Sequence, residues 1–425
     1  MTPQIKQRIE QIRRGEVPEG YKKTKVGLVP EEWEIKKLSD ISDEIKEVAG
    51  TGKYETLSIS AGIGFVNQAN KFGKELSGKQ YEKYTVLRKG DFAYNKGNSK
   101  KYPQGCVYRL KDRDSAAVPN VFECFRIKEG NKTYIEQVFI SGFLNRQLSK
   151  KINHGVRDDG LLNLTGEDFY KSYIIIPPLP EQEKIVEILQ AQDKVIEFQQ
   201  KKIDELKRLK KGYLSKMFPK KGCNVPEIRF PGFTDPWEQR KLGEISDSYS
   251  GGTPPVGIKE YYGGQIPFIR SAEINSEITE LFITEDGLKN SSARIVDIGD
   301  ILYALYGATS GEVGRARLKG AINQAILSIK PHTGYDSEYL AQWLRKSKQS
   351  IIETYLQGGQ GNLSGAIVKE LSVDFPSLKE QQAVGAYFRQ LDNLITLHQR
   401  KCEEQKKYKK ALMQILLTGI VRVTL

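Results

Sequence analysis

The longest regular pattern of apolar and polar positions in this chain of 425 residues runs from residue 181 to residue 218. Apolar residues recur there at steps of three and four, which predicts one long amphipathic helix with an apolar face that packs on another helix. That face consists of Ile185, Leu189, Ile196, Ile203, Leu206, Tyr213 and Met217. Polar Gln192, Gln199 and Lys210 interrupt it, so the helix is a weak coiled coil by itself and needs a matching partner.

The matching helix is predicted in the same chain, 199 residues further on. At this shift Glu181 and Asp193 align with Glu380 and Asp392, with further identities and no gap. The apolar face repeats as Val384, Phe388, Leu391, Ile395 and Leu412, with the apolar Leu391 in the place of the polar Gln192. Two copies of one amphipathic helix are expected to bury these faces on each other. At 1.5 Å per residue, each would be about 60 Å long.

A second repeat occurs in the sequence segments that precede the two long helices. The phrase WEIKKLSDIS at residues 33–42 returns as WEQRKLGEIS at residues 237–246, and NLTG at 163–166 returns as NLSG at 362–365. Between these phrases, short apolar runs at 90–97 and 299–307 predict matching strands, and residues 135–148 and 337–355 predict helices. We therefore expect an α+β fold with an internal repeat.

The predicted boundaries follow from these repeats. Residues 1–178 form an N-terminal segment and a first domain, 179–218 the first long helix, 219–376 a linker and a second domain, and 377–425 the second long helix and a tail. Residues 5–12 predict a short amphipathic helix within the N-terminal segment.

Charge narrows the class of partner. The formal net charge is +13 and the pI is near 9.2, which favours nucleic acid and, second, an anionic membrane. No run of eighteen apolar residues and no signal-peptide pattern occur, so we expect a cytoplasmic protein and no membrane partner. Four cysteines without CxxC spacing indicate neither a disulfide framework nor a zinc site.

Catalytic signatures are incomplete. A glycine- and lysine-rich stretch that ends at Gln80 lacks the hydroxyl residue of a P-loop, and no adenine-methyltransferase tetrad is present. The three histidines lie far apart and have no HExxH or serine-elbow pattern around them. These observations predict a non-catalytic chain without a cofactor or metal.

Candidate DNA-contacting residues lie in polar, glycine-rich loops that follow the two matching strands. Lysines can neutralise phosphates, and amides and hydroxyls can reach base edges. The candidates in the first domain are Lys96, Asn98, Ser99, Lys100, Lys101 and Tyr102, and those in the second are Tyr306, Thr309 and Ser310. Weaker candidates are Arg157, Arg270, Gln324 and Gln360. An ordinary solvated turn is the alternative at each loop.

Taken together, these motifs resemble those of a known protein family. Each of the two units begins with a Trp-Glu phrase and ends with PLPEQ or PSLKEQQ. Each is followed by a helix, which ends in KRLKKGYLSKMF or KKYKKALMQILLTG. This arrangement resembles the specificity subunit of type I restriction-modification systems. The resemblance covers nearly the whole chain. SGGTPPVGIKEYYGGQIPFIR with YGATSGEVG resembles one type of target recognition domain, and AYNKGNSKKYPQG with GLLNLTGEDF resembles another.

The resemblance implies two target recognition domains that each read one half of an asymmetric split DNA site. The helices would form an antiparallel coiled coil with a pseudo-two-fold relation, would hold half-sites about 34 Å apart and would dock modification subunits. The implied partners are double-stranded DNA, two modification subunits that bind S-adenosylmethionine and, optionally, restriction subunits. The tail would finish beside residues 5–25. A methyltransferase or nuclease with an unrecognised site, and a coiled-coil scaffold, are the alternatives.

Overall fold

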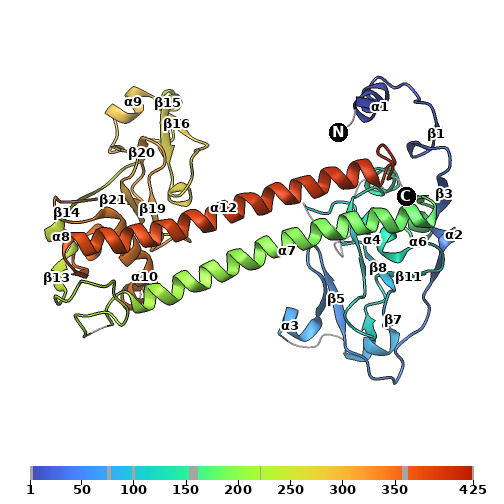
Figure 1. Cartoon of the computed structure of the whole chain (residues 1–425), viewed down its shortest axis with the longest axis horizontal. Coiled ribbons are helices and arrows are strands. Elements are labelled where there is room, and N and C mark those ends of the chain that lie inside the picture. Colours follow the sequence, from blue (N-terminus) through green and yellow to red (C-terminus); the bar gives the residue numbers. More distant parts are fainter. Residues whose placement is uncertain are drawn as a thin grey trace. The chain divides into compact units, whose positions relative to one another are not determined.

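The computed structural model describes residues 3–73, 78–97, 101–152, 161–220, 222–356 and 362–423. The chain divides into two compact units: unit 1 comprises Met1–Phe198 and Cys402–Leu425, and unit 2 comprises Gln199–Lys401. Helices α7 (Leu179–Lys216) and α12 (Leu378–Leu416) each contribute one half to each unit (Figure 1). Both long helices are present as the apolar periodicity predicts.

Unit 1 is built around a four-stranded antiparallel sheet of order β4-β11-β8-β9, formed by β4 (Ser42–Glu44), β11 (Glu123–Ile127), β8 (Phe92–Asn95) and β9 (Cys106–Arg109). β3 (Glu34–Lys37) pairs with β12 (Tyr173–Ile176). The other strands are β1 (Tyr21–Thr24), β2 (Gly27–Pro30), β5 (Leu57–Ser60), β6 (Gly64–Asn67), β7 (Thr85–Arg88) and β10 (Ser115–Val118). The helices are α1 (Pro3–Arg13), α2 (Leu38–Ile41), α3 (Gln68–Phe72), α4 (Lys132–Ile140), α5 (Asn145–Ser149), α6 (Gly166–Tyr170) and the 3₁₀ helix η1 (Gly78–Lys83).

Unit 2 repeats this sheet with the order β14-β21-β18-β19, formed by β14 (Ser246–Ser250), β21 (Ile326–Pro331), β18 (Ile301–Ala304) and β19 (Val313–Arg315). β13 (Glu238–Lys241) pairs with β22 (Ser372–Phe375), as β3 does with β12. A second sheet has the order β16-β15-β20-β17, with β16 (Phe282–Ile283), β15 (Tyr262–Ile269), β20 (Gly320–Ile322) and β17 (Arg294–Val296). The helices are α8 (Leu242–Ile245), α9 (Glu285–Lys289), α10 (Ser337–Leu356), α11 (Gly365–Lys369) and the 3₁₀ helices η2 (Lys259–Tyr261) and η3 (Ser271–Glu273).

The sequence repeat is therefore a repeat of structure, and the chain has the α+β class predicted for it. The strands expected at 90–97 and 299–307 are β8 and β18. The helix expected at 337–355 is α10, and the one at 5–12 is α1. The single helix expected over 135–148 is wrong: α4 and α5 are separated at Gly142, which adopts a left-handed φ of 74° that a helix interior does not allow.

The two long helices run antiparallel and side by side within each unit (Figure 1). In unit 1, Lys409 Nζ lies 2.7 and 2.8 Å from the carboxylate oxygens of Asp193. In unit 2, Lys210 Nζ lies 2.6 and 2.8 Å from those of Asp392. The shift of 199 residues turns one pair into the other, since 193 + 199 = 392 and 210 + 199 = 409.

Most of the residues predicted to pack between the helices are buried. Ile185 and Leu189 share a hydrophobic cluster with Met413 and Leu416 in unit 1, and Leu412 packs against it. The corresponding cluster of unit 2 contains Leu206, Val384, Phe388, Leu391 and Ile395. Ile203 is also buried, and Ile196 is half-buried.

The C-terminal tail lies beside the N-terminal segment in unit 1, as expected. The Tyr21 hydroxyl donates a hydrogen bond to the carbonyl oxygen of Gly419 at 2.6 Å, and Arg8 donates to the carbonyl of Ile420 at 3.2 Å. Arg422 binds Glu181, at the beginning of α7, through hydrogen bonds of 2.7 and 2.9 Å. Residues from both chain ends thus complete one unit.

Candidate nucleic-acid interface

The predicted reading loop of unit 1 opens at one end of the four-stranded sheet. The register places Tyr94 opposite Glu123 and Asn95 opposite Cys106, so the loop that joins β8 to β9 and the segment before β11 meet there. The segment that precedes α6 joins this end, because Leu162 N–H donates to the carbonyl oxygen of Lys96 at 3.0 Å. Three chain segments therefore border one surface.

Lys96 is held inside this surface by an ion pair. Its Nζ lies 2.8 Å from Oε1 of Glu123, and both side chains are mostly buried. Glu123 in turn packs against Gly166, where an added Cβ would lie 2.7 Å from Oε2. The NLTG phrase therefore contributes to packing, and the charge of Lys96 is already partly compensated.

Lys101 and Tyr102 lie at the more accessible part of the same loop. Lys101 is exposed and its Nζ lies 5.7 Å from the centroid of the half-buried Tyr102 ring. Next to them is the turn between β5 and β6, where the Gly62 N–H donates to the Tyr108 hydroxyl at 2.7 Å. Nothing in the sequence pattern pointed to this turn. Asn98, Ser99, Lys100 and Arg157 lie outside the described residues.

The loops of unit 2 gather at the corresponding end of its sheet. Ala304 at the end of β18 pairs with Ile326 at the beginning of β21, and Ser250 at the end of β14 pairs with Leu327. The Leu363 N–H donates to the carbonyl oxygen of Leu305 at 3.0 Å, a contact similar in place to that of Leu162, although the repeat aligns Leu363 with Leu164. The candidate loops of both units thus occupy the same place in the same sheet topology.

The three candidates after β18 differ in accessibility. Ser310 is buried and its hydroxyl donates to the Leu305 carbonyl at 3.2 Å, so it holds the loop in shape. Tyr306 packs partly against the hydrophobic cluster of unit 2. Thr309 is half-buried. Among these three, Tyr306 and Thr309 keep surface that a ligand can reach, and a contact of Ser310 with DNA is not supported by its position.

Gln324 fixes a second loop, which lies in the SGGTPP phrase and for which the sequence named no DNA-contacting residue. Its Oε1 accepts a hydrogen bond of 2.6 Å from the Thr253 hydroxyl, and both side chains are exposed. The loop at residues 251–256 packs tightly on β20, since an added Cβ on Gly251 would lie 1.8 Å from the carbonyl oxygen of Ile322. The adjacent glycines and prolines of SGGTPP were the available signal of this rigid loop. Gln360 lies outside the described residues.

Arg270 directly follows β15, at the end where Ile269 pairs with Ile322 of β20, and its guanidinium belongs to a partly exposed ion-pair network. Its guanidinium donates to Glu273 at 2.7 and 3.2 Å and to Glu280 at 2.7 Å. Burial alone would raise the pKa of Glu273, but hydrogen bonds from Arg270 and neighbouring groups lower it to about 2. Because two carboxylates already neutralise Arg270, its proposed contact with DNA has no support from this geometry.

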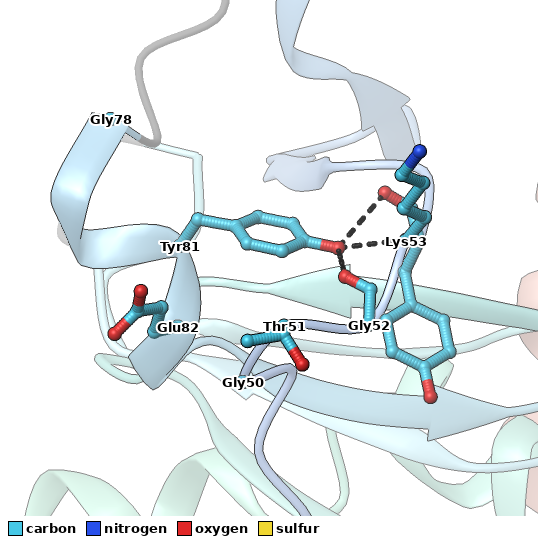
Figure 2. Close-up of a pocket in the computed structure, with 8 residues that line it drawn as sticks. Gly50, Thr51, Gly52, Lys53, Gly78, Tyr81 and Glu82 are labelled. Atoms are coloured by element: carbon cyan, nitrogen blue, oxygen red, sulfur yellow. Dashed lines mark hydrogen bonds between the residues drawn. The ribbon is translucent and has the colours of Figure 1, made fainter.

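Unit 1 also contains a polar pocket of about 630 Å³, lined by Gly50, Thr51, Gly52, Lys53, Tyr54, Gly78, Tyr81 and Glu82 (Figure 2). Figure 2 shows the Tyr81 ring crossing it toward Gly52. The Tyr81 hydroxyl donates to the Gly52 carbonyl and accepts from the Tyr54 N–H, both at 2.7 Å. These bonds explain the tyrosine as a support for the glycine-rich loop.

A cationic groove of about 700 Å³ lies in unit 2 among α12, the turn before β18 and the end of β19. Its lining includes Arg315, Arg317, Arg389 and Arg400, with Glu277 and Glu338 as the acidic residues. Glu277 accepts from Arg317 at 2.8 Å and from Arg400 at 3.0 Å, and so joins the domain to the helix. The groove borders the sheet end opposite to the candidate loops.

Exposed apolar side chains occur on the long helices in a repeated pattern. In unit 1 they are Val195, Phe198 and Tyr408, which are 42%, 63% and 55% exposed. The shift of 199 residues places Leu394, Leu397 and Leu209 at these positions in unit 2, and they are 43%, 46% and 43% exposed. Residues three apart share a helix face, so Val195 and Phe198 lie together on α7, and the Asp193–Lys409 pair shows that Tyr408 lies at the same level of the helix pair. Each unit therefore has one apolar helix patch.

Comparison with known proteins identifies the fold and the class. The family description "Type I restriction modification DNA specificity domain" matches the chain twice, over residues 30–208 and 234–406. The chain belongs to this family. The type I restriction enzyme MjaX specificity subunit of Methanocaldococcus jannaschii is 27% identical over 95% of this chain and 97% of its own length. Both matches agree with the resemblance seen in the repeated phrases.

Solved structures agree in fold. A chain from a study of complex assembly and conformational transition of the type I restriction-modification system has a TM-score of 0.59 at 19% identity, and covers 92% of this chain and 99% of that one. The type I S subunit from M. genitalium has a TM-score of 0.52 at 14% identity, over 92% and 97%. The architecture of two target recognition domains and two antiparallel helices is therefore that of specificity subunits.

Within this family the chain is the non-catalytic, DNA-recognising component of a type I restriction-modification system. DNA and the other subunits of the system are accordingly its partners. Among the described residues, no group of three or more His, Cys, Asp or Glu side chains could hold a metal ion. No helix in the part of the chain that the structure describes is long and apolar enough to cross a membrane.

Proposed function

We propose that each four-stranded sheet presents its loop end to one half of a bipartite sequence in double-stranded DNA. The observation that carries this proposal is that both units place polar, glycine-containing loops at the same sheet end while the side chains there differ. Two domains with the same backbone framework and different side chains are suited to bind different DNA sequences. The DNA site in this proposal is therefore asymmetric. Lys101 contributes a phosphate contact, whereas Gln324 and Thr253 are suited to base edges.

Two substitutions separate these roles. Lys101→Ala should weaken DNA binding about equally for all sequences and reduce the salt dependence by about one ion. Gln324→Ala should instead relax the base preference in one half-site and leave the other half unchanged. Both are measured by DNA binding and methylation mapping with the co-produced modification subunit. Lys89→Ala, at the opposite end of the unit 1 sheet, is the matched control.

The apolar helix patches are the proposed docking surfaces for two copies of the modification subunit. Contiguous exposed apolar surface at matching positions marks an interaction site more strongly than single exposed residues do. Since the two patches are related by the repeat, they suit two identical partners. The proposed assembly contains this chain, DNA, two modification subunits and, optionally, restriction subunits.

Stoichiometry tests the docking surfaces. Phe198→Ser and Leu397→Ser should each reduce the bound modification subunits from two to one, and the double variant should bind none. Light scattering of the purified complexes gives the count. Lys202→Ser, on the same helix, is the control that should retain two copies. Loss of both copies from either single variant would contradict independent patches.

The helices also set the spacer of the site in this proposal. Insertion of four residues, about one helical turn, after both Lys201 and Arg400 lengthens the two helices by the same amount. Methylation mapping should then show the same two half-sites with a longer spacer. An unchanged spacer would exclude this role for the helices.

A further inference from the structure

The two long helices differ at one repeat position, and the partner helix matches the difference. In unit 1, Gln192 Nε2 donates to Oε1 of Gln405 at 2.7 Å and to its carbonyl oxygen at 3.3 Å. The shift of 199 residues puts Leu391 in the place of Gln192 and Leu206 in the place of Gln405. Both leucines are buried in the same hydrophobic cluster of unit 2. One site is a polar pair and its repeat is an apolar pair.

If two copies of the same long helix packed on each other, both the polar pair and the apolar pair would be lost. If α7 packed antiparallel on a second copy of α7 in this register, Gln192 would face Leu206 at two places, because Leu206 occupies the position of Gln405. Two copies of α12 would likewise place Leu391 against Gln405 twice. Each arrangement places two amides opposite apolar side chains, where the hydrogen bond between Gln192 and Gln405 is lost. Polar residues in a helix seam are known to contribute to the choice of partner in coiled coils.

The contact at the centre of the repeat adds to this preference. Gln199 and His398 are equivalent positions, since 199 + 199 = 398, and His398 Nδ1 lies 2.7 Å from Gln199 Oε1. Two copies of α12 would bring two His398 rings together, and these repel each other when protonated. The native pair joins unlike residues, which only the two different helices provide.

The ion pairs do not discriminate between like and unlike helices. Asp193 binds Lys409, and the equivalent of Lys409 in α7 is Lys210, so a pair of α7 helices would still join an aspartate to a lysine. The same holds for Asp392 and Lys409 in a pair of α12 helices. These charges therefore fix the register, and the choice of partner has to come from the seam.

We propose that the Gln192–Gln405 and Leu206–Leu391 pairs are a recognition code by which α7 selects α12 and rejects a second copy of itself. The code directs the chain to fold back on itself. It also prevents two chains from associating through like helices, which would place two copies of the same reader in one assembly.

Two variants of the intact chain test the code. Gln192→Leu with Leu391→Gln keeps the composition, but makes both like-helix pairs matched and both native pairs mismatched. The quadruple variant adds Leu206→Gln and Gln405→Leu, which restores matched native pairs with the code exchanged. After refolding from urea, the double variant should contain roughly ten-fold more dimer than the unchanged chain, and the quadruple variant should behave like the unchanged chain. Sedimentation velocity measures the dimer fraction.

A measurement of stability by urea unfolding gives a second result that decides the proposal if the double variant folds poorly. The urea midpoint should fall in the double variant and recover in the quadruple variant, although the latter carries twice as many changes. A quadruple variant that is no better than the double variant would overturn the proposal. So would a double variant that is indistinguishable from the unchanged chain in both dimer content and midpoint.

Discussion

Trp33 donates its indole N–H to the buried carboxylate of Glu181 at 2.9 Å. In unit 2 the equivalent glutamate, Glu380, is bound by Arg229 through hydrogen bonds of 2.7 and 2.8 Å. The equivalent indole, that of Trp237, is buried without a hydrogen-bond partner among the described residues. Both units thus place a carboxylate near the beginning of a long helix, and an arginine from outside the helix neutralises it.

Arg229→Met should destabilise unit 2 by about 3 kcal/mol. Glu380 is 1% exposed, so removal of the arginine leaves a carboxylate in the interior without a cation. Urea unfolding measures the loss, and the added substitution Glu380→Gln should recover part of it. Arg240→Met is the control: this arginine pairs with Glu238 on the surface, where an ion pair contributes less than about 1 kcal/mol. Equal effects at the two arginines would show that the buried pair has no special importance.

Gly419→Ala should weaken the closure of unit 1 by about 2–4 kcal/mol. Gly419 has a φ of 72°, and an added Cβ would lie 2.5 Å from Pro30 and 3.1 Å from Trp33. Backbone strain and the steric clash therefore add. Gly334→Ala isolates the strain, because Gly334 has a φ of 102° and nothing within 4 Å of the added Cβ. It should cost only about 1 kcal/mol. Thermal unfolding of both variants gives the difference, and equal losses would contradict a packed tail.

The long helices could be predicted because apolar period and internal repeat gave independent signals for the same residues. Which arginine reaches which glutamate could not be predicted. Arg422 comes from the C-terminal tail and Arg229 from the linker, so these two arginines occupy places that no sequence shift aligns. The break at Gly142 was missed because apolar spacing continues through it.

The loops predicted to contact DNA could likewise be predicted only in part from the sequence. Their place after β8 and β18 follows from the strand pattern, since residues after a strand must lie at its end. Which of their side chains are available depends on contacts that the pattern does not contain, as the pairing of Lys96 with Glu123 and the burial of Ser310 illustrate. The ion pair between Arg270 and Glu273, which are three residues apart, could have been predicted from the sequence.

Acid should destabilise unit 2 partly through Glu273. Its pKa is lowered to about 2 in the folded chain from an ordinary value of 4.5, so it contributes stability above pH 4.5 that is lost as the pH falls toward 2. Because Arg270 is partly exposed, we expect on the order of 2 kcal/mol. Glu273→Gln should lose this amount at pH 7 and show a flatter acid limb in urea unfolding. A parallel acid limb in the variant would mean that Glu273 is not responsible.

Gly251→Ala should alter recognition of one half of the DNA site. An added Cβ at Gly251 would lie 1.8 Å from the Ile322 carbonyl oxygen, so the loop at 251–256 must move away from β20. That movement separates Thr253 from Gln324 and displaces the surface proposed to contact bases. Methylation mapping should show a weakened or relaxed half-site for unit 2 and an unchanged half-site for unit 1. Gly257→Ala is the control, because an added Cβ there meets nothing within 4 Å. If both half-sites change together, the loop acts on the stability of the whole chain and not on the reading of one sequence.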